Sequence, residues 1–221
     1  MKKVLIRALL ILILGIIPQG CQTELLEIET ETETGKSSQE ITLGEVSNPK
    51  AKQPIVGDKV IKTLTIGDSL SAGGSYAEIL SKDPRFKGSK VIALSSMNTT
   101  WMRNQLLQEL KRIEQTNEKP YRFIIVFGGT NYSESRQEDL QQMYSLIKQY
   151  GAKSIGVTLP LGKLAQRDKP LNEWIKKNPT LYLVVDFATE KREDFIADRI
   201  HLTAKKQKKM AEQLAKQLTT K

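Results

Sequence analysis

The chain has 221 residues, a formal net charge of +9, one cysteine and one histidine. This length allows one domain of ordinary size, with a core large enough to fold unaided. A lone cysteine excludes an internal disulfide, and one cysteine with one histidine makes no plausible zinc site, so disulfide-stapled and zinc-dependent classes are set aside.

Residues 1–20 have the layout of a secretory signal peptide. A basic segment that contains Lys2, Lys3 and Arg7 precedes the apolar residues 8–17. This apolar run is too short for a comfortable membrane span, which favours a signal peptide over a transmembrane helix. We therefore predict that the protein is exported from the cytoplasm.

Cys21 directly follows this signal. Its position after Gly20 is similar to that of the lipidated cysteine at a bacterial lipoprotein cleavage site. This similarity predicts a lipid anchor at Cys21 and a location at a cell-envelope membrane. Pro18 and Gln19 are unusual residues at such a site, so an ordinary signal peptide or an uncleaved anchor is the alternative.

Residues 21–57 differ in composition from the rest of the chain. They contain seven Glu, three Lys and few apolar residues, which predicts an acidic, disordered tether. Because the tether carries −4 and the signal +3, the remaining residues 58–221 carry +10. A basic domain favours anionic surfaces such as envelope polymers or lipid head groups. Nucleic acid is not an expected partner, because no basic stripe is interleaved with aromatic residues.

From Val60 onward, short apolar runs alternate with helical patterns. The apolar runs predict five strands, at residues 60–66, 90–95, 122–127, 154–159 and 181–187. Apolar residues at helical spacing predict helices at residues 70–81, 100–115, 136–150, 170–177 and 204–219, with Pro170 in the first turn of its helix. This alternation predicts an α/β fold, in which a five-stranded parallel sheet has helices on both faces.

Three polar segments lie at equivalent ends of these elements. Asp68 and Ser69 follow the first strand, the Gly-Gly-Thr-Asn sequence at 128–131 follows the third, and Asp198 and His201 precede the last helix. Loops beyond the carboxyl ends of parallel strands form the ligand crevice. We therefore expect these segments to meet at one edge of the sheet.

The side chains of these segments are suited to acyl transfer. His201 is the only imidazole, so it is the only candidate base that can take the Ser69 proton and return it near neutral pH. Asp198 is expected to orient the ring and to stabilise the imidazolium. Asn131 and the Ser69 backbone N–H are expected to form an oxyanion hole. A strand-to-helix turn at Ser69 would aim further N–H groups at the oxyanion.

Each residue also has a structural alternative. Ser69 can cap a helix, the 128–131 sequence can be a turn with a permissive backbone, and Asp198 with His201 can be a helix-start pair. The nucleophile elbow Gly-x-Ser-x-Gly, the dinucleotide motif Gly-x-Gly-x-x-Gly and the P-loop do not occur in the chain. The chain has Gly-Asp-Ser-Leu at 67–70 and Asp-Arg-Ile-His at 198–201. The presence of both motifs in this order favours the catalytic interpretation.

Three blocks of the chain resemble those of the SGNH/GDSL hydrolase family. Ile-Gly-Asp-Ser-Leu-Ser-Ala-Gly at 66–73 is similar to the nucleophile block, Gly-Thr-Asn at 129–131 to the Gly-x-Asn block, and Asp-Arg-Ile-His-Leu-Thr at 198–203 to the Asp-x-x-His block. The resemblance covers roughly residues 60–221. It implies a flavodoxin-like three-layer fold and ester hydrolysis through an acyl-Ser69 intermediate, without metal or cofactor. Asp68 and Gly129, from the same blocks, are candidates for substrate binding.

Two positions depart from the family pattern. The family usually has an oxyanion-hole glycine after the second strand, and Met97 aligns best with it in this chain. A backbone N–H can donate from any residue except proline, so Met97 is the expected third donor. Tyr132 follows Asn131, where the family commonly has Asp.

The expected function is that of an envelope serine esterase that removes a short acyl group from a carbohydrate or a small ester. The domain is short for the family, which leaves little sequence for a lid or a long acyl channel. Trp101 and Tyr132 are candidates for stacking on a sugar, although core packing is favoured for Trp101. A catalytically inactive binding or structural lipoprotein is the alternative, and a basic polymer or nucleic-acid binder is less favoured.

Overall fold

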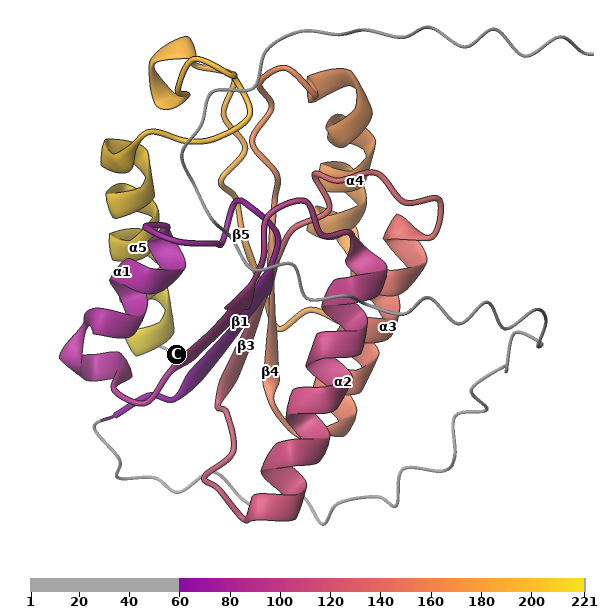
Figure 1. The fold of residues 1–221 in the computed structure, drawn as a ribbon, viewed down its shortest axis with the longest axis vertical. Coiled ribbons are helices and arrows are strands. Elements are labelled where there is room, and N and C mark those ends of the chain that lie inside the picture. The colour runs from indigo at the N-terminus through magenta and orange to yellow at the C-terminus, as the bar shows by residue number, and fades with distance from the viewer. Residues whose placement is uncertain (1–59, 221) are drawn as a thin grey trace, which may run out of the picture. The chain divides into compact units, whose positions relative to one another are not determined.

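A computed structural model describes residues 60–220 and contains a five-stranded parallel sheet between two layers of helices (Figure 1). The strand order is β2-β1-β3-β4-β5. The strands are β1 (Thr63–Gly67), β2 (Lys90–Ala93), β3 (Phe123–Phe127), β4 (Lys153–Val157) and β5 (Leu183–Val185). Every pairing within this sheet is parallel. The prediction of an α/β fold with this sheet is confirmed.

Helices cover both faces of the sheet. They are α1 (Tyr76–Lys82), α2 (Thr99–Thr116), α3 (Arg136–Gln149), α4 (Ala165–Lys177) and α5 (Ala204–Thr219), with short 3-10 turns at Pro84–Phe86 and Arg192–Asp194. Helix α1 packs against α5 on one face, and α2 packs against α3 on the other, where α4 also lies (Figure 1).

The two central strands explain why the apolar runs of the sequence are continuous. Every residue of β1 and of β3 is buried, because helices cover both of their faces. The outer strand β2 is only partly buried. Burial therefore falls from the centre of the sheet to this edge, and the loops that follow β1 and β3 extend from its most buried strands.

Helix α1 begins six residues later than predicted, at Tyr76. Gly74 has a φ of +71°, in the left-handed region that glycine adopts without a steric penalty, and this conformation interrupts the helix. Ser75 then caps α1 by accepting a hydrogen bond from the N–H of Ala77. Ser69 consequently lies in a turn that precedes α1, and α1 does not begin at Ser69 as expected.

Helix α4 begins earlier than predicted, at Ala165, so Pro170 lies inside the helix. Proline has no N–H to donate to the preceding turn, which makes an interior position unfavourable. Tertiary contacts outweigh this cost, because Asp168 in the first turn is fully buried and forms ion pairs with Arg136 and Arg167. The sequence prediction placed Pro170 in the first turn because proline is common there. In the structure, the buried ion pairs of Asp168 instead determine where the helix begins.

The predicted signal peptide at 1–20, the candidate lipidation site Cys21 and the tether at 21–57 lie outside the described residues. Within residues 60–220, none of the helices combines the length and the apolar character that a membrane span requires.

Candidate active site

Ser69 and Asn131 lie at the point where the chain changes direction across the sheet. From β1 the chain moves outward to β2, and it then returns to form β3 on the other side of β1. Ser69 follows β1 and Asn131 follows β3, so both lie beyond the carboxyl ends of adjacent strands. Open α/β sheets bind ligands at such a switch point, because the two loops diverge and leave a crevice.

His201 connects Ser69 to Asp198. The His201 Nε2 atom is 3.0 Å from Ser69 Oγ, and the Nδ1 atom is 2.5 Å from Asp198 Oδ2. The structure therefore brings together the three residues that the sequence placed in one mechanism, although Ser69 and His201 are 132 positions apart. This is the hydrogen-bonded order that a serine nucleophile, a general base and an orienting carboxylate require.

The Asp198–His201 turn is held by its own backbone. Asp198 Oδ1 accepts hydrogen bonds from the N–H groups of Ile200 and His201, at 2.8 and 3.0 Å. Partial burial alone would raise the pKa of Asp198, but the hydrogen bonds from the His201 ring and from the two N–H groups lower it to about 2. Asp198 is therefore ionised at neutral pH and can stabilise a positive charge on His201.

Gly162 supports this turn from the loop between β4 and α4. A Cβ atom at position 162 would lie 2.0 Å from the carbonyl oxygen of Arg199, so only glycine allows the two loops to approach so closely. The same oxygen accepts a hydrogen bond of 2.8 Å from the N–H of Lys163. Arg199 itself has a φ of +57°, in the left-handed region. Neighbouring backbone thus fixes the direction in which the His201 ring points.

Asp68 is fully buried, and it joins the Ser69 turn to the loop after β3. Its Oδ1 atom accepts from the N–H of Leu70 at 3.0 Å. Its Oδ2 atom accepts from the N–H groups of Gly129 and Thr130 and from the Thr130 hydroxyl, at 2.8–3.0 Å. Burial raises the pKa of Asp68, and these hydrogen bonds oppose the rise.

This arrangement does not fit the substrate-binding roles expected for Asp68 and Gly129. Both oxygens of Asp68 already accept hydrogen bonds from the protein, and the side chain has no exposed surface. Gly129 is also buried, and its carbonyl accepts a hydrogen bond from Arg136. Both residues instead position the loops that carry Ser69 and Asn131.

Asn131 lines the cleft into which Ser69 and His201 also project. The cleft has a volume of about 190 Å³, and its wall also contains Ser95, Ser96 and Leu164. One N–H of the Asn131 amide donates to the Met97 carbonyl at 2.8 Å. Because a primary amide carries two N–H donors, the second is available to an oxygen in the cleft.

Ser96 and Met97, which follow β2, have different surroundings. The Met97 N–H lies 3.4 Å from the Leu94 carbonyl and so closes a local turn, and Met97 does not line the cleft. Ser96 lines the cleft and has a φ of +66°, the left-handed conformation that favours glycine. Ser96 therefore lies nearer to the cleft than Met97 does, and the role of the Met97 N–H as a third donor stays a prediction.

A cluster of charged residues behind the cleft was not found from the sequence. Asp168 forms ion pairs of 2.9 Å with Arg136 and Arg167. Arg136 then donates to the carbonyl of Gly129, and Arg167 to the carbonyl of Thr130. The two arginines thereby hold the residues that immediately precede Asn131. No motif connects these residues in the sequence, and only the packing of α3 and α4 reveals them.

The two aromatic candidates for sugar contact have different surroundings. Tyr132 follows Asn131 and has 67% of its surface exposed. Trp101 packs against the hydrophobic core, as favoured for it from the sequence. Within residues 60–220, no cluster of three or more His, Cys, Asp or Glu side chains is suited to hold a metal ion.

Comparisons with solved structures show the same fold in several hydrolases. One is a protein assigned to the lipolytic G-D-S-L family from Desulfitobacterium hafniense DCB-2, with 19% identity, a TM-score of 0.56, and coverage of 70% of this chain and 98% of that chain. Another is the psychrotrophic esterase EstA from Pseudoalteromonas sp., with 14% identity, a TM-score of 0.53, and coverage of 74% and 98%.

A third similar structure is an acetylxylan esterase from Geobacillus stearothermophilus, with 15% identity, a TM-score of 0.54, and coverage of 72% of this chain and 95% of that chain. Scans against family models and curated protein sequences give no match. The likeness therefore lies in the fold. Residues 60–220 have the three-layer α/β fold of the solved SGNH/GDSL hydrolases.

Proposed function

We propose that this protein is a serine esterase that removes short acyl groups, with Ser69 as its nucleophile. The observation that carries the proposal is the continuous contact from Asp198 through His201 to Ser69, at 2.5 and 3.0 Å. The contact lies in a cleft at the switch point of the sheet, where a substrate can reach the Ser69 hydroxyl. The fold shared with known esterases supports the same reaction class.

Each step of the reaction is assigned to a residue of the cleft. Ser69 Oγ attacks the acyl carbonyl carbon while His201 Nε2 takes the hydroxyl proton. The tetrahedral intermediate then expels the alcohol, to which His201 returns that proton, and an acyl-Ser69 ester is left. Water then attacks this ester while His201 takes a proton from it, and His201 returns the proton to Ser69 Oγ as the bond to Ser69 breaks and the carboxylic acid leaves. Asp198 stays ionised and stabilises the imidazolium in both halves of the reaction.

A direct test is to incubate the full-length protein with p-nitrophenyl acetate and, separately, with a serine-reactive phosphonate. We expect hydrolysis of the ester, and a phosphonyl group on Ser69 when the labelled protein is digested and sequenced by mass spectrometry. If neither ester hydrolysis nor a phosphonyl group on Ser69 is found, the alternative of a non-catalytic binding protein is favoured. The contact between His201 and Ser69 argues against that alternative.

Asn131→Ala should lower kcat for p-nitrophenyl acetate by about 10²–10³-fold with a smaller effect on KM, because the lost N–H acts mainly on the transition state. Asn104→Ala, on the exposed side of α2, is the matched control and should retain wild-type kinetics. Equal rates for the Asn131→Ala variant and the wild type would show that the oxyanion is bound elsewhere.

Substrate preference should favour short acyl chains. The cleft volume of about 190 Å³ is below the roughly 300–1,000 Å³ of pockets that enclose drug-sized ligands. Little of a long chain can be buried there, so the gain of about 0.8 kcal/mol per buried CH₂ is lost. We expect kcat/KM for p-nitrophenyl esters to be highest for acetate and to fall toward palmitate. A steady rise with chain length would indicate a lipid substrate.

We also propose that the domain is anchored to a cell-envelope membrane through lipid on Cys21. The proposal is supported by the basic and apolar segments that precede Gly20 and Cys21. Two or more acyl chains hold a protein stably at a bilayer, whereas one does not. Mass spectrometry of the mature N-terminus should find a diacylglyceryl group on Cys21. A free Cys21 thiol, or cleavage at another residue, would exclude this anchor.

A further inference from the structure

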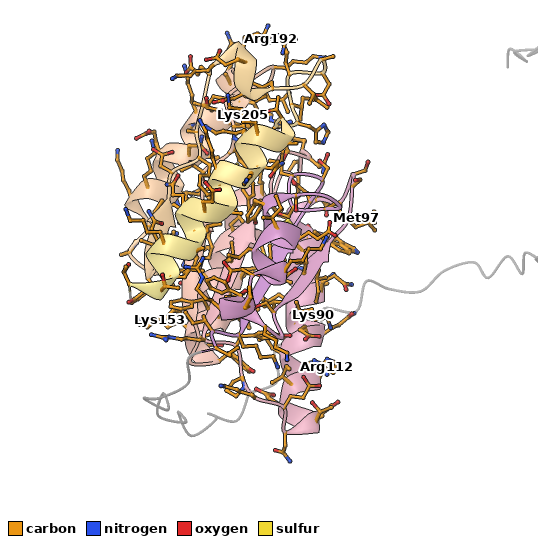
Figure 2. The ribbon with its side chains drawn as sticks, turned by 90° about the vertical axis from the view of Figure 1, so that its left-hand side faces the viewer. Lys90, Met97, Arg112, Lys153, Arg192 and Lys205 are labelled. Atoms are coloured by element: carbon orange, nitrogen blue, oxygen red, sulfur yellow. The ribbon has the colours of Figure 1, made fainter. Side chains whose placement is uncertain are left out.

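A second, larger cavity lies between the segment that follows β5 and the first turns of α5. It has a volume of about 450 Å³. Figure 2 shows Lys205, which lines it, at the start of α5 and toward the end of the domain where Arg192 lies. The charged residues of its wall, which we name the basic cavity, are Lys191, Lys205, Lys206, Lys209, Glu193 and Asp194.

The wall of the basic cavity has more lysine side chains than carboxylates to pair with them. Asp194 already accepts from Lys206 Nζ at 3.0 Å and from the Thr189 hydroxyl at 2.6 Å, so Asp194 and Lys206 neutralise each other. Within residues 60–220, Lys205 and Lys209 form no ion pair with an acidic side chain. Four lysines face two carboxylates, which leaves an excess of positive charge on the cavity wall.

The basic cavity and the catalytic cleft are built on the same short ribbon. Phe195 and Leu202 form an antiparallel bridge, and the N–H of Thr203 donates to the carbonyl of Asp194 at 2.9 Å. Thr203 and Asp194 line the basic cavity, whereas His201 lines the catalytic cleft. The Cα atoms of His201 and Thr203 are separated by two peptide units, which span about 7 Å at most.

We propose that the basic cavity is an anion subsite, which binds a carboxylate or phosphate group of the same polymer that carries the ester. This inference rests on the proposed esterase function and specifies its substrate class as an acylated, anionic polymer. A polymer whose ester is bound at Ser69 would reach Lys205 and Lys209 if its neighbouring units follow the ribbon from the cleft to the basic cavity. The charge of +10 on residues 58–221 would favour the approach of such a polymer.

The test measures binding of the full-length Ser69→Ala protein to unesterified polygalacturonate and to poly(glycerol phosphate), with neutral dextran as the uncharged comparison. Without the nucleophile, binding is read independently of turnover. We expect the Lys205→Glu/Lys209→Glu variant to bind at least one of the two anionic polymers about tenfold or more weakly than the parent. Lys205→Gln/Lys209→Gln should weaken binding in the same direction but less, and added salt should reduce the difference.

Lys208→Glu/Lys216→Glu is the matched control, because it changes the charge of the same helix equally at exposed positions outside the basic cavity. Equal weakening by both Glu pairs would show diffuse charge attraction and would overturn the proposal. Binding to phosphatidylglycerol vesicles is measured in parallel. Failure of the parent to bind either polymer, with or without binding to the vesicles, would also overturn the proposal. If the wild-type protein, which keeps Ser69, fails to hydrolyse p-nitrophenyl acetate, the esterase function is refuted. The binding result obtained with Ser69→Ala stands independently of that outcome.

Discussion

Ser69→Ala and His201→Ala should each lower kcat for p-nitrophenyl acetate by about 10⁴–10⁶-fold, the range seen when one member of a serine triad is removed. Ser69 supplies the only oxygen within hydrogen-bond distance of the His201 Nε2 atom among the described residues. His201 is the only histidine of the chain, so no second imidazole can substitute. The measurement is the initial rate of p-nitrophenol release by variants whose thermal unfolding matches that of the wild type.

Ser95→Ala is the control for the nucleophile, because Ser95 lines the same cleft but, among the described residues, the His201 ring forms its hydrogen bonds with Asp198 and Ser69. This variant should keep most of the wild-type rate. The double variant Ser69→Ala/His201→Ala should be no slower than either single variant, since the two residues act as one unit. A folded Ser69→Ala or His201→Ala protein with a near wild-type rate would refute the mechanism.

Asp198→Asn should lower kcat by about 10⁴-fold while the fold is kept, because an amide in place of the carboxylate favours the wrong tautomer of the imidazole. The carboxylate accepts from the His201 Nδ1 atom and thereby leaves Nε2 free to accept the Ser69 proton. Asp83→Asn is the matched control. Asp83 pairs with Arg85 beyond the end of α1, outside the site, so its variant should retain wild-type kcat.

The pH profile should test the role of Asp198. Because the pKa of Asp198 is lowered to about 2, its carboxylate is ionised throughout an assay from pH 4 upward. Since the lowered pKa keeps the carboxylate charged until the pH falls toward 2, protonation of Asp198 should cause no loss of kcat/KM above pH 4. The measurement is kcat/KM for p-nitrophenyl acetate as a function of pH in the wild type and in Asp198→Asn. A loss above pH 4 that is present in the wild type and absent from Asp198→Asn would contradict this assignment.

The meeting of Ser69, His201 and Asp198 was predictable because each lies in a short block next to a strand or helix end. The remainder of the site was harder to predict for physical reasons. The left-handed φ of Ser96, which lines the cleft, is a property of the folded loop and leaves no mark in composition. Asp68 was interpreted as a ligand contact, since its complete burial depends on residues 61 positions away.

The helix boundaries were also predicted well only where local pattern and packing agree. Periodicity located α2 and α5 to within a residue or two, because their apolar faces pack along their whole length. Periodicity failed at α1 and α4. The left-handed backbone of Gly74 delays the start of α1. The ion pairs of Asp168 stabilise a start of α4 that precedes Pro170. Local propensity is a weak prior wherever buried polar contacts decide the packing.

The buried carboxylate of Asp68 has a consequence for the entropy of catalysis. It binds the backbone on both sides of the cleft, so the Ser69 turn and the Asn131 loop become ordered together when the chain folds. Donors that are fixed before the substrate arrives need no reorganisation as charge develops on the oxyanion. The conformational cost of assembling the site is therefore part of the folding free energy, and substrate binding does not have to supply it.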